Sequence, residues 1–216
     1  MSIPMYKRCA VTAATFLALI LSCQAAAGDV EIVRVEEVWT LSVGEPSINA
    51  NGPQVSMVMS PFSDLNRHFF MFYINLKTDP VYVAGGAQVQ HMYGDEVVNS
   101  RDNPNDSLLD QDAELLQWTQ VMEIKNDQVQ FEIKDGSSKS WGGFGGLGHL
   151  RLTVDTGQTN LNSYRPQNSI TQSGIGYAGN RVVSLVLQRI TWIASDGQRY
   201  DLHAPIDIDS DLDPWD

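Results

Sequence analysis

The stretch QVQFEIK, residues 128–134, decides the fold class because its apolar and polar side chains alternate one by one. Val129, Phe131 and Ile133 are separated by single polar residues. A period of two sends successive side chains to opposite faces of an extended backbone, whereas a helix needs a period of 3.6. The stretch therefore predicts a β-strand with one buried face and one solvent-facing face.

The same alternation recurs along most of the chain, in segments rich in the β-branched and aromatic residues that suit a pleated surface. It predicts an all-β protein, an antiparallel β-sandwich with long Gly-rich loops, with a barrel as the second choice. The strand pattern resembles that of jelly-roll and concanavalin-like domains. Further strands are expected at Val30–Val43, Gln54–Ser60, His68–Lys77, Gly86–Tyr93, Gln117–Lys125, His149–Asp155, Arg181–Ala194 and Arg199–Asp207.

Short polar turns separate these strands. Asn126-Asp127 and Asp196-Gly197 each lie between two strands and predict hairpins. Asp135-Gly136 is expected to end another strand. The one helix candidate is Ser107–Gln117, in which pairs of leucines have roughly helical spacing.

The N-terminus has the pattern of a secretory signal peptide. Lys7 and Arg8 precede an apolar run over residues 10–21, and the small residues 25–27 form a cleavage site after Ala27. Residues 1–27 are therefore expected to be removed, which predicts a secreted or periplasmic protein. The β-sandwich would then occupy residues 28–205, and an acidic C-terminal tail residues 206–216.

A second interpretation of the same segment is a lipid anchor. The run Ile20–Cys23 resembles a bacterial lipobox, in which Cys23 would be lipidated and the protein held on a membrane, although Ser22 departs from the usual glycine or alanine. Both cysteines of the chain, Cys9 and Cys23, lie in this segment. The exported domain is thus expected to fold without disulfides.

The net charge of the chain limits the classes of partner that it is expected to bind. The whole sequence has a net charge of −12, and loss of the basic Lys7 and Arg8 would bring it to −14. Nucleic acids and anionic lipid surfaces bind positively charged faces, so neither is an expected partner. No membrane span is expected in the mature chain. Divalent cations, neutral sugars and protein surfaces remain as candidates.

A Gly-rich stretch carries the strongest motif. Gly143, Gly145 and Gly148 have the spacing G-x-G-x-x-G of dinucleotide-binding loops, but the residues that follow alternate as a strand and not as the required helix. Nucleotide binding is therefore not expected. The binding interpretation instead assigns carbohydrate contacts to aromatic rings in two Gly-rich loops, and the alternative is that these rings close the edge of the core. The rings concerned are Trp141, Phe144 and Tyr177.

Two carboxylates could carry glycosidase chemistry. Glu123 and Glu132 lie on the strands flanking the Asn126-Asp127 turn, and paired carboxylates across a cleft are what a glycoside hydrolase needs. A charged sheet face shared with Lys125 and Lys134 is the simpler interpretation.

Calcium is the one candidate cofactor. Asp207, Asp209, Asp211 and Asp213 occupy every second position near the C-terminus, and clustered oxygen ligands suit calcium, although the spacing is not that of an EF-hand. A solvated acidic tail is the alternative. The histidines have no zinc-site spacing.

These observations favour an exported, non-catalytic binding or cell-envelope module whose ligand is a glycan or a protein surface. A polysaccharide-active glycoside hydrolase or lyase is the alternative. A purely structural envelope protein is the third possibility.

Overall fold

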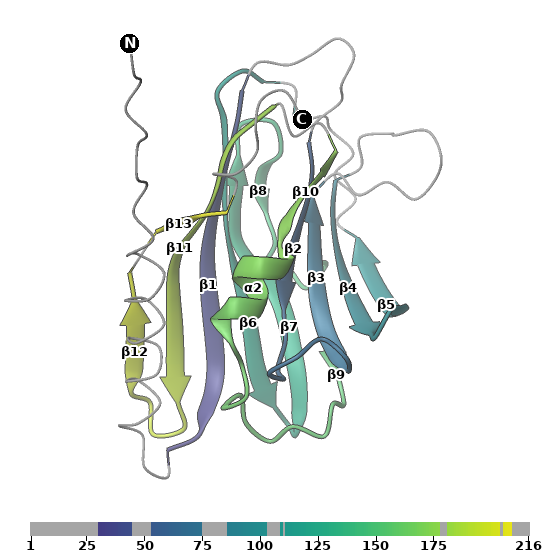
Figure 1. The fold of residues 1–216 in the computed structure, drawn as a ribbon, viewed down its shortest axis with the longest axis vertical. Helices are drawn as coiled ribbons and strands as arrows, with labels where there is room; N and C mark the ends of the chain where they lie inside the picture. Colours follow the sequence, from purple (N-terminus) through teal and green to yellow (C-terminus); the bar gives the residue numbers. More distant parts are fainter. Residues whose placement is uncertain are drawn as a thin grey trace, which may run out of the picture. The chain divides into compact units, whose positions relative to one another are not determined.

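The computed structural model describes residues 30–44, 53–74, 86–102, 109, 111–177, 181–203 and 205–208. The compact unit that begins at Ile32 is nearly all strand, with two antiparallel sheets packed face to face (Figure 1). The predicted antiparallel β-sandwich is confirmed.

The first sheet has eight strands, in the order β12-β11-β1-β6-β7-β8, with β13 paired to β11 and β9 paired to β7. All of its pairings are antiparallel. Its strands are β1 (Ile32–Val43), β6 (Glu114–Lys125), β7 (Gln128–Ser138), β8 (Gly142–Phe144), β9 (Arg151–Val154), β11 (Val182–Ala194), β12 (Arg199–Leu202) and β13 (Ile206–Asp207).

The second sheet has five strands, in the order β10-β2-β3-β4-β5. Strand β5 lies at its edge and all seven of its residues are exposed, so it has no apolar alternation and the sequence did not predict it. The strands are β2 (Gln54–Met59), β3 (His68–Ile74), β4 (Ala87–Tyr93), β5 (Glu96–Asp102) and β10 (Gly174–Tyr177).

The core lies between the two sheets and is built from alternate residues of each strand. In β1 the odd-numbered residues from Val35 to Val43 are fully buried. Trp39 and Trp118 stack on neighbouring strands at a centroid distance of 6.5 Å. Phe70 and Phe131 stack between the sheets at 5.0 Å. Each such side chain contributes about 1.5–3 kcal/mol by its burial, so the domain coheres through apolar packing.

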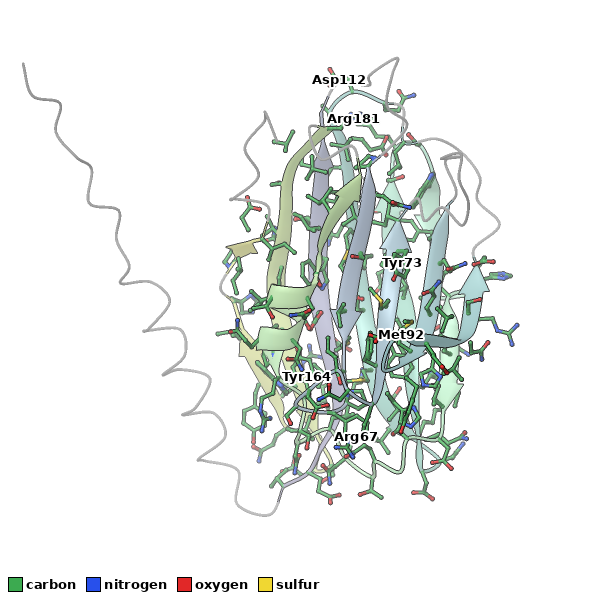
Figure 2. All side chains as sticks on the ribbon, turned by 45° about the vertical axis from the view of Figure 1, so that its right-hand side comes forward. Arg67, Tyr73, Met92, Asp112, Tyr164 and Arg181 are labelled. Atoms are coloured by element: carbon green, nitrogen blue, oxygen red, sulfur yellow. The ribbon has the colours of Figure 1, made fainter. Side chains whose placement is uncertain are left out.

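Buried polar contacts close one end of the sandwich. Arg181 is 3% exposed, and its guanidinium donates to the carbonyls of Leu109 at 2.9 Å and Gly44 at 3.2 Å. Arg181 and Asp112 lie at this end, and Arg67 lies at the opposite end (Figure 2). These hydrogen bonds satisfy backbone carbonyls where strands finish.

The hairpin predictions are confirmed in two of three places. Asn126 and Asp127 both have positive φ, 52° and 58°, between β6 and β7, and Gly197 turns the chain between β11 and β12 with φ of 85°. Asp135-Gly136 does not end a strand. The pairing shifts there from Lys134 to Ser137, so the two residues form a bulge within β7.

The helix expected at Ser107–Gln117 is wrong for the residues that are described. Strand β6 begins at Glu114, and Leu115 is 55% exposed while Leu116 is buried, which is the period of a strand. Burial against the second sheet outweighs the weak helical spacing of the leucines. The described helix is instead α2 (Pro166–Gln172), which begins at a proline, a favoured first helical residue, and lies over β1 and β6 in Figure 1.

The ends of the chain are partly described. The signal segment, including Cys23 and Ala27, lies outside the described residues. Ile206 and Asp207 are the last residues of the strand expected at Arg199–Asp207 and the first of the expected acidic tail, and they form β13 on β11; the amide of Ile208 donates to the Leu185 carbonyl at 2.9 Å. Within the described residues, no helix has the length and apolar character needed to cross a membrane.

Candidate functional site

A polar groove lies where the free edges of the two sheets meet. Strand β5 is the edge of the second sheet, and β9 pairs with β7 at an edge of the first. The groove has a volume of about 470 Å³ and is lined almost wholly by polar side chains. Its lining residues are Ser100, Arg101 and Asp102 from β5 and Gly148, His149 and Arg151 from the start of β9 and the loop before it.

The Gly-rich stretch forms one wall of this groove. Strands β8 and β9 both pair with β7, and the loop 145–150 interrupts what is otherwise a single edge strand. The Gly146 amide donates to the Ile133 carbonyl at 2.8 Å, and the Ile133 amide donates to the Leu150 carbonyl at 3.0 Å. The glycines therefore lead into strand β9 and not into the helix that follows the glycines of a dinucleotide-binding loop.

Gly148 shapes the wall beside Arg151. Its φ is +82°, a conformation that L side chains rarely adopt, and a Cβ there would lie 3.8 Å from Nη1 of Arg151. The Nη2 atom of Arg151 donates to Oε1 of Glu132 at 2.6 Å, and Nζ of Lys134 lies 3.3 Å from the other oxygen. Glu132 is only 1% exposed, so one buried carboxylate holds two cations, of which Arg151 lines the groove.

The opposite wall comes from the end of β5. Arg101 pairs with Val89, a fully buried residue, so the Arg101 side chain extends from the face of β5 that is turned toward the first sheet. Asp102 pairs with Gln88 and accepts a hydrogen bond from its amide. Arg101 and Asp102 are consecutive residues of a strand, so the guanidinium and the carboxylate extend from opposite faces of β5 where it lines the groove.

The aromatic residues expected to contact a ligand do not form an exposed platform at β8. Trp141 and Phe144 are 7% and 5% exposed and meet edge to face at a centroid distance of 5.6 Å in the core. A Cβ on Gly136 would lie 2.4 Å from the Phe144 ring, so this glycine makes room for it. These two rings close the core, which was the alternative interpretation. Tyr177 ends β10, where its backbone pairs with Gln54.

The two candidate carboxylates share the outer face of the first sheet. Glu123 pairs with Gln130, and Glu132 pairs with Val121, so the two glutamates are diagonal neighbours on β6 and β7. Each is engaged in an ion pair: Arg34 lies 3.4 Å from Glu123, and Arg151 lies 2.6 Å from Glu132. The described residues thus place them in a charged sheet surface.

The proposed calcium ligands are mostly outside the described residues. Asp207 is in β13 and accepts a hydrogen bond from the Leu185 amide at 3.3 Å, while Asp209, Asp211 and Asp213 are not described. Among the described residues, no three histidine, cysteine, aspartate or glutamate side chains are grouped to hold a metal ion.

Sequence reasoning missed a fully buried carboxylate, Glu37. Its four hydrogen-bond donors are Tyr164 Oη at 2.6 Å, Ser169 Oγ at 2.5 Å, Trp39 Nε1 at 2.9 Å and Gln120 Nε2 at 3.2 Å. Burial raises the pKa of Glu37, and the four donors oppose that rise. The signal was present in the sequence, since Glu37 occupies an apolar position between Val35 and Trp39 in the alternation of β1.

A second missed feature is a pair of histidines between the sheets. Nδ1 of His68 and Nε2 of His91 are 2.9 Å apart, and the rings are stacked at a centroid distance of 5.1 Å. Burial lowers the pKa of both, and the nearby charge of Arg67 lowers that of His68 further. The residues are 23 positions apart, so only strand pairing brings them together.

Comparisons with known proteins add no family to this description. No protein-family model matches the chain, and neither the curated proteins nor the solved structures include a significant match. The function must therefore be argued from the geometry of the described residues.

Proposed function

We propose that this protein is an exported, non-catalytic binding module, and that a saccharide binds in the groove between β5 and β9. The observation that carries the proposal is the convergence of Ser100, Arg101, Asp102, His149 and Arg151 from strands of both sheets on one groove. Binding sites place a few polar groups to fix a ligand's orientation, and the polar side chains that line this groove are suited to do so.

The chemistry of the lining suits a sugar. A sugar hydroxyl both donates and accepts hydrogen bonds, so its site needs acceptors, such as Asp102, as well as donors, such as Arg101. The side chains of Arg101, Asp102, His149 and Arg151 are exposed, so a ligand can reach them without rearrangement of the sandwich. A volume of about 470 Å³ is within the range of about 300–1,000 Å³ typical of small-ligand sites.

Export is supported by the signal-like N-terminus and by the confinement of both cysteines to it. Mass spectrometry of the exported protein tests this part of the proposal. A mature chain that begins at Gly28 supports simple cleavage, and one that begins at a lipidated Cys23 supports attachment to a membrane. A chain that keeps residue 1 and stays in the cytosol would overturn export.

A glycan array followed by calorimetry tests the binding site. The parent protein should bind at least one array glycan, and Arg101→Ala and Asp102→Asn should each weaken that binding at least tenfold. Arg199→Ala is the matched control, because Arg199 is an exposed arginine on β12, a strand that does not line the groove. A blank array, or binding that the groove variants leave unchanged, would overturn the proposal.

The polysaccharide-active enzyme is the second candidate. Diagonal neighbours on adjacent strands have Cα atoms about 7–8 Å apart, and an inverting glycosidase needs two carboxyl groups about 6.5–9.5 Å apart. Glu123 and Glu132 have this relationship. Release of reducing ends from a polysaccharide, abolished by Glu123→Gln, would favour this candidate over the binding module.

A further inference from the structure

We infer that the groove takes an acidic saccharide, with the carboxylate of one sugar unit bound between Arg101 and Arg151. This inference rests on the proposed function and names the class of its ligand. It also departs from the expectation of neutral sugars that the net charge of −12 produced. The reason is that arginine side chains line the groove although the chain as a whole has a negative net charge.

The first step is a charge count at the groove. Arg151 and Lys134 both pair with Glu132, so this cluster has two cations for one carboxylate. Arg101 and Asp102 on the other wall balance each other. The charged lining residues, counted together with Glu132 and Lys134, therefore have one positive charge in excess, which matches a single carboxylate on a ligand.

The second step is the geometry of the guanidinium groups. Glu132 holds the Nη2 side of Arg151, and the absence of a side chain on Gly148 leaves space beside Nη1. Arg101 approaches from the other sheet, on the inward face of β5. An arginine presents a planar fork of N–H donors that matches a carboxylate, and one already held by a buried partner loses less side-chain freedom on binding.

The third step limits the charge density of the ligand. Asp102 lines the groove and the chain as a whole is strongly acidic, so a densely charged polyanion would be repelled. A saccharide with few carboxylates, such as a short uronate oligomer, meets the arginines with less repulsion than a long polyanion does. Because the arginines are exposed, the binding should weaken as salt is added.

The experiment compares trigalacturonic acid with its fully methyl-esterified form, which has the same sugar units without the charge. Calorimetry at low salt should give a dissociation constant at least tenfold lower for the acid than for the ester. Raising the salt to about 0.5 M should reduce this preference, because the Debye length is about 10 Å already at 0.1 M. Arg101→Gln should abolish the preference and Arg199→Gln should preserve it. Arg101 is exposed, so its replacement leaves the core intact.

The outcomes separate the inference from the proposed function. Equal binding of acid and ester, lost in Arg101→Gln, would overturn the acidic preference and leave the groove as a saccharide site. A preference for the acid that Arg101→Gln leaves unchanged would also overturn the inference, because the carboxylate would then bind elsewhere. Failure of these and all array glycans to bind would overturn the proposed function itself.

Discussion

The hydroxyl of Tyr164 donates a 2.6 Å hydrogen bond to Oε1 of Glu37, 127 positions earlier in the chain. Ser169, in α2, donates to the same oxygen at 2.5 Å. Both donors belong to the segment between β9 and β10, so the buried carboxylate fastens that segment to the inner face of the first sheet. Tyr164 is labelled in Figure 2. A carboxylate without donors would be costly in such a site, so the contact and the fold depend on each other.

Replacing Tyr164 by phenylalanine should destabilise the domain. The variant keeps the ring, which packs against Trp192 at 6.3 Å, and removes one donor from a buried carboxylate. We expect a loss of about 1–3 kcal/mol in the free energy of unfolding. Urea denaturation measures it. Tyr200→Phe removes a hydroxyl whose bond to Gln198 is exposed and should change stability by less than about 0.5 kcal/mol. Equal effects of the two variants would contradict the role assigned to Glu37.

The raised pKa of Glu37 predicts how stability depends on pH. The folded state keeps this proton to a higher pH than the unfolded chain does. The stabilisation that the proton contributes is therefore fully present below pH 4.5, and it is lost as the pH rises through the pKa of Glu37 in the folded state. Glu37→Gln cannot ionise, but its amide meets donors that need an acceptor, so it should be less stable than the parent at low pH. The difference in the free energy of unfolding between the parent and Glu37→Gln should become smaller as the pH rises above 4.5. A gap that widens with pH would refute the raised pKa.

The histidine pair predicts that the stability of the domain falls as the pH is lowered, which is opposite to the pH dependence predicted for Glu37. The pKa values of His68 and His91 are lowered in the folded state. The stabilisation that the two neutral rings contribute is therefore present above about pH 6.5, and it is lost as the pH falls through their folded-state pKa values. Thermal melting of the parent should therefore shift downward below pH 6.5. His91→Gln keeps a polar partner for His68 and removes one titrating ring, so its downward shift should be smaller. His203→Gln, at an exposed position, should follow the parent curve.

Gly136 should resist substitution because Phe144 occupies the space beside it. A Cβ there would lie 2.4 Å from the Phe144 ring and 2.5 Å from its carbonyl oxygen. Gly136→Ala should destabilise the domain by about 1–3 kcal/mol, the usual cost of overpacking a core. Gly174→Ala is the control, since an added Cβ meets nothing within 4 Å. A shift in the urea midpoint of Gly174→Ala that matched Gly136→Ala would contradict this explanation.

Predictions from the sequence succeeded where local alternation carried the information. Val129, Phe131 and Ile133 are all fully buried in β7, as the alternation required, whereas Gln130 and Glu132, expected to face solvent, are also buried. Strand β5 escaped prediction because an edge strand with two exposed faces needs no apolar residues. Leucines 115 and 116 suggested a helix because two adjacent apolar residues fit either period.

The candidate site was less predictable than the fold. The sequence directed attention to Gly148 through its motif, but to Trp141 and Phe144 as ligand contacts, and the structure buries both rings. Whether an aromatic ring in a Gly-rich loop points outward or inward depends on the space that other strands leave. That space here is created by Gly136 on a neighbouring strand.

The sequence by itself determined that the chain forms antiparallel strands with one apolar face, because that property follows from the period of neighbouring side chains. Only the tertiary structure decided which distant groups come together: Arg101 and Arg151 line one groove, His68 contacts His91, and Tyr164 donates to Glu37. These encounters depend on strand register and on the packing of one sheet on the other. Both are set by the free energy of the whole core and not by any local stretch.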